Sequence, residues 1–543
     1  CVYCNCYKSN KDEHITKLRI QLRNYALLNN LPMTLTDERV YNLCRKSVTG
    51  GLANVLHRVN IAGETPINHF KYNVEQTMNT PTDQTSTSKS ITSIDSEHIT
   101  SHVIGLDFHS LYPSVFSSVE HPFNPYTNNI MYMPGKVIEY VEPKSEKQKR
   151  WCLTKILPWN RRENDDCDLF IAEVKGHIDE KYINEYVNFP PIIRPLTYKT
   201  DRETIGDYMY DYLVKHDLPR DQTETKLTQL LSTKDEYMTF STYYLWFLVD
   251  YCHFVIDDIK SVTLFTKHRA FMPFVTEFID NRNKAISENN RGLNNFYKLS
   301  LNGSSGYDGM NSEKYGKIKL CNKTKTFIEH LSPNYLGTTE INDNLYAVEV
   351  EPHVVRCKTC VQELTFTLDN AKFWYLNFIY CFMHRAFDMT KMHYCFGDTD
   401  SMYWAISNEA GGFPIKDKFF YDKYANLFFT DQKKILGIAI EKEGDCLFAL
   451  APKSYCMKNK DEVIAMRTKS IDNKCAVKID GTLISIEDYQ NTINDNPLVK
   501  VEEKRYRTKK NGDIIEKIIS KHPLTAMHTK MICLPNGSCI SFL

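Results

Sequence analysis

Three aspartates, in two segments far apart along the chain, have the chemistry and placement of ligands for hard metal ions. Asp107 begins the run Asp107-Phe108-His109-Ser110-Leu111-Tyr112-Pro113, and two more follow in Gly397-Asp398-Thr399-Asp400-Ser401. Mg²⁺ takes oxygen ligands and keeps part of its water shell, so a site for nucleotide phosphates needs only a few carboxylates. Two such ions can hold the attacking and the leaving oxygen of a phosphoryl transfer. Together, the two segments predict two-metal phosphoryl transfer.

The elements around these aspartates must bring the carboxylates together. The apolar run 102–106 ends at Asp107 and precedes a Leu-Tyr-Pro turn, which predicts an aspartate at a strand end. Residues 394–396 and 402–406 are strand-like and flank Gly-Asp-Thr-Asp, which predicts a hairpin whose turn carries the acids. Taken alone, Asp-Thr-Asp is ordinary turn chemistry, because such side chains often cap their own backbone.

In this order, Asp-x-x-Ser-Leu-Tyr-Pro and Asp-Thr-Asp-Ser resemble the A and C motifs of family B DNA polymerases. The resemblance implies that Asp107 and Asp400 are the main ligands of two Mg²⁺ ions, for which Mn²⁺ can substitute. It also implies that Asp398 is an auxiliary catalytic carboxylate and that Phe108 adds its backbone carbonyl to the metal site.

The resemblance extends to the nucleotide. The backbone around Ser110 and Leu111 would cradle the incoming triphosphate. The ring of Tyr112 would lie under the sugar and exclude a 2′-hydroxyl, which selects deoxynucleotides.

The segment 297–306 offers cations for the triphosphate. Lys298 and Asn302 are four residues apart, so on a helix they share one face. The segment resembles the family's B motif, Lys-x-x-x-Asn-Ser-x-Tyr-Gly, and this implies that Lys298 contacts the phosphates and can protonate the leaving pyrophosphate. Gly303 replaces the usual serine and Ser305 the usual aromatic residue, which leaves open how the nascent base pair is checked.

A stripe with three- and four-residue spacing predicts a first fingers helix upstream, formed by Phe271, Phe274, Phe278, Arg282 and Ala285. Arg282 and Lys284 on this helix are further nucleotide-binding candidates. The pattern does not decide which of the two points inward, and a solvent-facing charge is an equal alternative for either.

Lys453 and Tyr455 follow a predicted hairpin of residues 438–443 and 446–450. Their Lys-x-Tyr spacing is similar to the family's primer-binding motif. The resemblance implies that Lys453 pairs with a primer phosphate and that Tyr455 supports the primer sugar or base.

Gly50 and Gly51 resemble the Tyr-x-Gly-Gly element of the same family, although Val48 replaces the tyrosine. Paired glycines let the backbone approach a phosphate closely, and a plain loop is an equal alternative. Thr399 and Ser401 complete the expected primer and DNA contacts.

Two long stretches between the motifs narrow the subfamily: 151–255, with a strand-like core at 169–174, and a second from about Lys317 to Val350. Protein-primed family B polymerases of linear plasmids, self-synthesising transposons and viruses with linear DNA carry insertions at these points. By resemblance, the first insertion would contact a priming (terminal) protein and the second would encircle the template. The implied partners of a monomeric enzyme are template-primer DNA, deoxynucleoside triphosphates and the terminal protein.

The implied fold is α+β: a right-hand polymerase with an antiparallel-sheet palm, helical fingers and thumb, and the two insertions. The expected divisions begin with an exonuclease-to-polymerase junction at 1–78 and a flexible linker at 79–96. The palm has two segments, at 97–150 and 351–457, and the two insertions lie at 151–255 and 311–350. The fingers are expected at 256–310 and the thumb at 458–543.

Composition is typical of an intracellular enzyme of several subdomains. The 543 residues exceed the size at which one core keeps growing. The 17 scattered cysteines, with no secretory signal or long apolar span, predict reduced thiols in the host nucleus or cytoplasm and no membrane segment. Net charge is zero, but basic residues crowd 500–510, where a thumb can neutralise duplex phosphates. A solvated strand pair, 500–507 with 514–519, is compatible with that role.

Two cysteine groups are candidates for zinc sites: Cys1, Cys4 and Cys6, and the pair Cys357 and Cys360. Structural zinc sites use four ligands in short-spaced pairs, and neither group supplies them. The pair precedes an apolar run, 364–382, that is more simply a buried helix, so zinc binding stays a minor alternative.

The predicted function is a template-directed DNA polymerase that adds deoxynucleotides to a primer 3′-hydroxyl or a terminal-protein hydroxyl and replicates a linear viral or mobile-element DNA. No Asp-x-Glu of the proofreading type precedes the Gly-Gly element, so polymerisation without proofreading is expected. Two alternatives remain: a two-metal nuclease or RNA-directed polymerase, and a catalytically inactive relic that acts as a DNA-binding replication protein.

Overall fold

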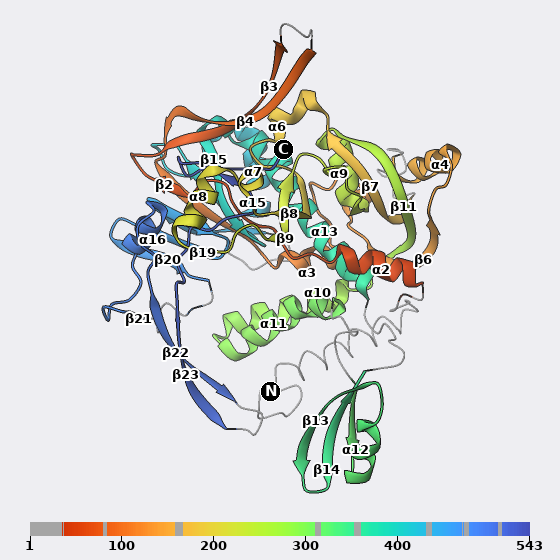
Figure 1. Ribbon diagram of the computed structural model, residues 1–543. Coiled ribbons are helices and arrows are strands. Elements are labelled where there is room, and N and C mark those ends of the chain that lie inside the picture. The colour runs from red at the N-terminus through yellow and green to blue at the C-terminus, as the bar shows by residue number, and fades with distance from the viewer. Residues whose placement is uncertain are drawn as a thin grey trace.

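The computed structural model describes residues 35, 37–79, 84–157, 167–309, 317–351, 360–429, 437–469, 471, 477–508 and 513–543 (Figure 1). Its helices combine with sheets whose strands all pair antiparallel, as expected for an α+β chain. Within this part of the chain, no helix is both long enough and apolar enough to span a bilayer. The cysteines that it describes are free thiols.

A five-stranded sheet carries the three aspartates. Its order is β1 (Ala53–Val55), β15 (Met392–Asp398), β16 (Ser401–Ile406), β5 (His102–Phe108) and β17 (Ile438–Gly444). These strands are rich in valine, isoleucine and aromatic residues, which suit a buried pleated surface. The predicted strand at Asp107 and the predicted hairpin around 398–400 are both confirmed.

Both faces of this sheet are covered. On one face lies α13 (Val361–Asn377), which is buried along its whole length; Phe108 stacks on its Tyr375 with ring centroids 5.4 Å apart. The other face packs on a second sheet through a cluster that includes Tyr403, Leu447 and Met457. The strands of the second sheet are, in order, β2 (Val59–Ile61), β18 (Cys446–Ala451), β19 (Ser454–Asn459) and β20 (Glu462–Arg467).

The predicted pairing of 438–443 with 446–450 is wrong. β17 pairs with β5 in the first sheet, whereas β18 pairs with β2 and β19 in the second. The two consecutive strands therefore belong to different layers, because each finds a more distant partner than its chain neighbour.

The first insertion has its own four-stranded sheet, in the order β10 (Met238–Ser241), β7 (Leu169–Ile178), β11 (Phe254–His268) and β6 (Met133–Val141). The predicted core 169–174 lies in β7. Residues 256–268, expected in the fingers, belong to β11, and β6 comes from the expected palm. The first insertion also contains the hairpin β8 (Ile192–Lys199) and β9 (Thr223–Leu230), and the helices η2 (Glu180–Tyr182), α6 (Ile183–Tyr186), α7 (Arg202–Ile205), α8 (Asp207–Lys215) and α9 (Thr242–Tyr251). The helices α3 (Leu111–Phe116) and η1 (Thr127–Asn129) lie earlier, in the expected palm, and α4 (Glu146–Ile156) crosses the boundary between the two.

Two helices lie in the segment expected to form the fingers, α10 (Met272–Ser287) and α11 (Arg291–Asp308). They pack together through Phe278 and Tyr297, whose ring centroids are 5.6 Å apart. The second insertion is a separate small unit, lowest in Figure 1, built from β12 (Lys317–Cys321), α12 (Lys323–His330), β13 (Tyr335–Asn342) and β14 (Leu345–Val350).

The N-terminal part differs from expectation. Residues 84–96, expected in a flexible linker, form most of β4 (Gln84–Ile99), which pairs with β3 (Pro66–Asn79) in the long ribbon at the top of Figure 1. The segment before it, expected as a separate junction, contributes α2 (Glu38–Ser47) and supplies β1 and β2 to the two central sheets.

The C-terminal region is mainly β-structure, where helices were expected. Its described residues contain one helix, α16 (Ile486–Ile493), and the strands β21 (Val477–Lys478), β22 (Val501–Thr508), β23 (Ile514–Lys521), β24 (Ile532–Cys533) and β25 (Cys539–Ile540). The alternative of a charged strand pair at 500–519 is thus confirmed as β22 and β23. Remaining elements lie before β17: the π-helical turn η4 (Phe378–Met383), α14 (His384–Ala386), η5 (Met389–Lys391) and α15 (Lys418–Phe428).

Candidate active site

The sheet register gathers the three aspartates at one end of the first sheet. Asp107 pairs with Ser401 across β5 and β16, and Asp398 pairs with the same serine across the hairpin. The Phe108 N–H donates to the Asp400 carbonyl at 2.7 Å, which fixes the turn against the end of β5. Segments that are distant in sequence thus meet at backbone hydrogen-bonding distance.

The turn between β15 and β16 is unusually tight. Thr399 has a φ of 65°, and the Asp400 N–H donates to the Asp398 carbonyl at 2.8 Å across it. A bond of this kind over a residue with positive φ defines a γ-turn of the rare, strained type. The Thr399 N–H also donates to the Leu52 carbonyl at 2.6 Å. The strain is therefore held in place by the loop that carries Gly50 and Gly51.

Gly51 closes the contact between that loop and the turn. A Cβ at Gly51 would lie 2.6 Å from Thr399 Cγ2 and 2.9 Å from the Tyr112 hydroxyl, whereas a Cβ at Gly50 would meet nothing within 4 Å. Only the second glycine is required by packing.

Burial and like charge shape the electrostatics of the acids. Burial raises the pKa of Asp400; neighbouring Asp398 and Glu441 add to the rise, while Lys298 opposes it. The pKa of Tyr112 is raised to about 12 by its burial and by Asp400 and Asp398. The site thus concentrates negative charge in a partly dehydrated place.

The Ser110–Tyr112 segment starts α3 beside this charge. Ser110, the N-cap of α3, has a φ of 47°, and Leu111 is buried while Tyr112 is half-buried against Gly51 and Thr399. The Arg282 guanidinium on α10 donates to the Ser110 hydroxyl at 3.4 Å. A cation on α10 therefore contacts the segment that follows Asp107.

The two cations on α10, Arg282 and Lys284, point in different directions. Arg282 is half-buried, holds Asn294 as well as Ser110, and points to the acids' side of the helix pair. Lys284 points away: its side chain is 72% exposed and lies 4.0 Å from Glu288. Lys298 and Asn302 are both exposed on α11, where their four-residue spacing places them on one face. Lys298 lowers the pKa of Asp400.

Lys453 and Tyr455 flank the acids on another side. Lys453 has a φ of 66° in the turn between β18 and β19, and its ammonium lies 3.7 Å from an Asp398 carboxylate oxygen. The Tyr455 ring packs on Phe396 and Tyr403, with centroids 4.5 and 5.5 Å apart. The strand register thus brings both beside the hairpin.

Two residues near the acids were missed from the sequence. Glu441 lies on β17 opposite the Asp107 strand and contributes to the pKa of Asp400. Lys442 donates to the Tyr403 hydroxyl at 3.2 Å and pairs with Glu441 at 2.9 Å. The only available signal was the Glu-Lys-Glu run at 441–443, which has the same appearance as any solvated strand.

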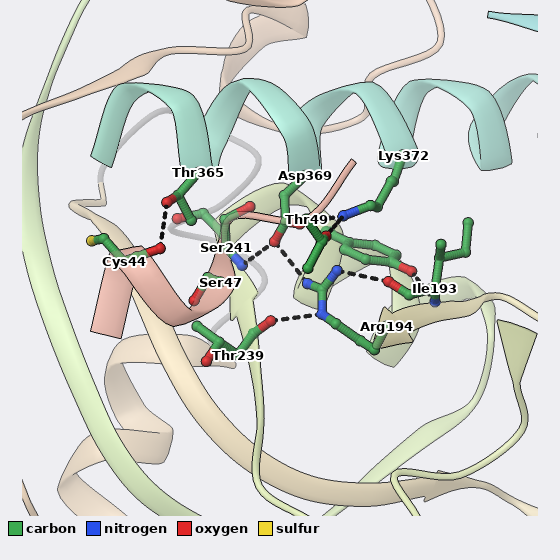
Figure 2. Close-up of polar contacts among 12 residues, drawn as sticks. Cys44, Ser47, Thr49, Ile193, Arg194, Thr239, Ser241, Thr365, Asp369 and Lys372 are labelled. Atoms are coloured by element: carbon green, nitrogen blue, oxygen red, sulfur yellow. Dashed lines mark hydrogen bonds and ion pairs between the residues drawn. The ribbon is translucent and has the colours of Figure 1, made fainter. Parts of the chain in front are cut away.

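A buried charge cluster anchors the Gly-Gly loop from behind (Figure 2). Asp369 on α13 accepts from Arg194 at 2.8 Å and from the Ser241 N–H at 2.9 Å, and Lys372 lies 3.4 Å from it. Lys372 donates to the Thr49 hydroxyl at 3.0 Å. The first insertion, α13 and the loop that ends at Gly51 are joined through one carboxylate.

Within the described residues, no group of three or more His, Cys, Asp or Glu side chains is arranged to hold a metal ion. Cys1, Cys4, Cys6 and Cys357 lie outside the described residues, and Cys360 is a buried thiol at the start of α13.

Comparisons with known proteins add a distant similarity. No protein-family model and no curated protein matches the sequence. The chain is similar to solved structures of Phi29 DNA polymerase. The complex with primer-template DNA and the ternary complex that also holds incoming nucleotides each give a TM-score of 0.49, at 11% and 13% identity, and cover 94% of this chain and 67% of that one. The complex with single-stranded DNA gives 0.43 at 13% identity, with 97% and 66% covered. A resemblance this distant concerns the fold alone.

Proposed function

We propose that this chain is a template-directed DNA polymerase that extends a primer 3′-hydroxyl with deoxynucleotides. The observation that carries the proposal is the register of β15, β16 and β5, which gathers Asp107, Asp398 and Asp400 at one sheet end. Arg282 and Lys298, from a separate helix pair, act on that same end. Acids that suit metal ions next to cations that suit a triphosphate are what phosphoryl transfer needs.

The donors present fit Mg²⁺. This ion is commonly held by one or two carboxylates together with water and substrate phosphates, so it does not need a closed group of three side chains. Asp107 and Asp400 would hold it with the Phe108 carbonyl, and Asp398 would stand beside them. When bound, it would supply Lewis-acid stabilisation of charge on the reacting phosphate oxygens.

The chain's own residues would position the reactants. The primer 3′-hydroxyl would lose its proton to water as O3′ bonds to the α-phosphorus and the bond to the pyrophosphate oxygen breaks. Arg282 and Lys298 would neutralise the triphosphate, and Lys298 would return a proton to the departing pyrophosphate. Tyr112, fixed against Gly51 and Thr399, would lie under the sugar. Lys453 and Tyr455 would hold the primer end, and positioning of this kind supplies much of the rate in phosphoryl transfer.

We further propose that synthesis on a linear genome starts from a hydroxyl of a separate priming protein. Support comes from the two insertions, since the strands of each pair in sheets other than the two central ones. The test is covalent labelling of a candidate priming protein with a radioactive deoxynucleotide and Mg²⁺. Label that survives denaturation and needs Asp400 is expected; label on nucleic acid primers alone would refute protein priming.

The polymerase proposal is tested by primer extension with Mg²⁺. Asp107→Asn and Asp400→Asn should each reduce nucleotide incorporation more than about 100-fold. Replacing a residue that only supports a metal ligand already costs up to about 100-fold, so replacing a ligand itself should cost more. Duplex binding should stay within about twofold, because neither carboxylate is expected to contact the duplex backbone. Asp217→Asn is the matched control, since that side chain is fully exposed and its φ of 49° suits asparagine.

Near-normal extension by either active-site variant would contradict the assignment. A wild-type chain that binds duplex but never extends a primer would instead favour the inactive DNA-binding relic.

A further inference from the structure

Four lysines from four distant segments form a cluster centred on Lys530, whose ammonium interacts electrostatically with the other three and with Asp398. They are Lys226 on β9, Lys453 after β18, Lys469 after β20, and Lys530 between β23 and β24. The ammonium of Lys530 donates to the Ala53 carbonyl at 3.0 Å, and Ala53 pairs with Asp398 across β1 and β15. The ammonium of Lys453 is 3.7 Å from Asp398 itself.

The cluster has too few carboxylates of its own. Glu224 pairs with Lys226, and Asp398 pairs with Lys453. Among the residues that the structure describes, neither Lys469 nor Lys530 forms an ion pair. The Lys226 ammonium also donates to the hydroxyl of Thr529 at 2.7 Å, and Thr529 directly precedes Lys530 in the chain. Four ammonium groups and two carboxylates leave an excess of positive charge.

The closeness of these ammonium groups disfavours their charged forms when no anion is bound. The pKa of Lys530 is lowered to about 8, first by burial and then by Lys226 and Lys469, while Asp398 opposes the change. A phosphate placed among these ammonium groups would offset both effects. Lysines gathered in this way are the usual electrostatic footprint of a nucleic acid backbone.

We propose that Lys226 and Lys530, with Lys453 and Lys469, form a phosphodiester-binding site for the strand whose 3′ end lies at the aspartates. This inference rests on the proposed function and extends it to the first insertion and the C-terminal segment. A strand is favoured over free phosphate or pyrophosphate because the triphosphate cations, Arg282 and Lys298, come from the fingers helices rather than from these segments. The lysine cluster instead includes Lys453, which lies two residues before Tyr455. Both are proposed to hold the primer end.

The first test measures equilibrium binding of a primer-template duplex across a series of KCl concentrations, with neither nucleotide nor Mg²⁺. Lys530→Met and Lys226→Met should each weaken binding about 5- to 20-fold and reduce the salt slope of log K by about one. Lys530→Arg, which keeps the charge, should stay near wild type. Lys460→Met is the matched control, because this exposed lysine lies at the other end of β19 from Lys453.

The second test identifies the bound phosphate. Primers are made with one neutral methylphosphonate at each of the last few linkages before the 3′ end. At one linkage, wild-type protein should lose affinity while Lys530→Met loses nothing further, which is the coupling expected of a direct contact. Equal losses in both proteins at every linkage would overturn the proposal. So would normal duplex affinity together with lost pyrophosphate binding in Lys530→Met, which would indicate a product site.

These outcomes are distinguishable from failure of the polymerase proposal. Duplex binding is measured without catalysis, so a chain that never extends a primer can still show the Lys530 coupling. A thermal unfolding midpoint for each variant identifies any that is misfolded, and Lys530→Arg keeps the test decisive in that case.

Discussion

At the residue scale, the informative difference is between two cations two positions apart on α10. Arg282 donates to Ser110, whereas Lys284 lies in solvent near Glu288. Arg282→Met should raise the KM for a deoxynucleotide about 10- to 100-fold, since a charged hydrogen bond contributes about 1.5–3 kcal/mol. Lys284→Met is the matched control and should stay within about twofold. Steady-state primer extension at varied nucleotide concentration measures both.

A Lys284 effect as large as that of Arg282 would mean that the helix rotates before nucleotide binds. Duplex affinity should be unaffected in either variant, which separates a nucleotide contact from a general loss of fold.

The sequence identified some of these side chains and could not identify others. Asp107, Asp398 and Asp400 were found because strand ends and tight turns have local signatures. The shared face of Lys298 and Asn302 follows from helical spacing alone. The choice between Arg282 and Lys284 depends on how α10 docks. Glu441 reaches the site through the non-local pairing of β17 with β5, and Lys530 reaches it through a hydrogen bond to the distant Ala53 carbonyl. Nothing in their immediate sequence distinguishes these last two from solvated charges.

At the element scale, the Gly-Gly loop and the Thr399 turn fit together at one glycine. Gly51→Ala places a methyl 2.6 Å from Thr399 Cγ2, so we expect a loss of about 1–3 kcal/mol of stability together with a lower kcat. Gly50→Ala is the matched control, since its Cβ would meet nothing within 4 Å and its φ is not positive. Thermal unfolding and primer extension measure the two effects.

Thr399→Ser provides a second check of this contact. Serine lacks the Cγ2 methyl, so adding it to Gly51→Ala should restore part of the lost stability through a coupling between the two positions. Strictly additive effects would show that the clash is relieved elsewhere.

The second insertion can be deleted without stretching the rest of the chain. Lys317 and Val350 are paired neighbours on β12 and β14, so a short Gly-Ser linker can replace 317–350 without stretching the chain. We expect the shortened protein to fill a single-stranded gap at a near-normal rate and to lose processive synthesis through duplex DNA. Product lengths on gapped and nicked templates measure this; equal loss on both would place the unit in the catalytic machinery.

Elements were predicted well where the pattern was local and poorly where the partner was distant. β5, β15 and β16 follow from apolar runs bounded by turn residues. β4 was expected to be a linker because its serines and threonines are polar, although threonine also favours strands and this segment pairs with β3. β17 and β18 look like a hairpin in sequence, but each pairs in a different sheet.

At the scale of the whole molecule, the expected division into consecutive blocks gives way to shared layers. β1 and β2 complete two sheets in which their direct partners, β15 and β18, lie hundreds of residues later in the chain. Arg194, Asp369 and Lys372 join the first insertion to α13 and to the loop at Gly51 (Figure 2). Such couplings depend on tertiary packing, so no boundary read along the sequence could reveal them.

This buried cluster makes the stability of the whole chain depend on pH through one lysine. Burial lowers the pKa of Lys372 from 10.5 to about 8, an effect that Asp369 opposes and Arg194 reinforces. Between pH 8 and 10.5 the unfolded chain keeps a proton that the folded chain has released, so stability rises with pH in this window. The full difference is about 3 kcal/mol at 1.36 kcal/mol per pKa unit. Below pH 8 the folded state carries the charge, and the penalty is complete.

Lys372→Met removes this ionisation while keeping a side chain of similar length. Unfolding midpoints of both proteins should be compared from pH 7 to 10, because Lys530 titrates in the same range in each and cancels in the difference. The unfolding midpoint of the wild type should rise relative to that of Lys372→Met as pH rises through 8. Parallel curves would show that the Lys372 ammonium is already stabilised where it lies, by Asp369 and Thr49 together. In that case the cluster would act as a rigid clamp on the Gly-Gly loop with no pH dependence, and Lys372→Met should then reduce kcat equally at every pH.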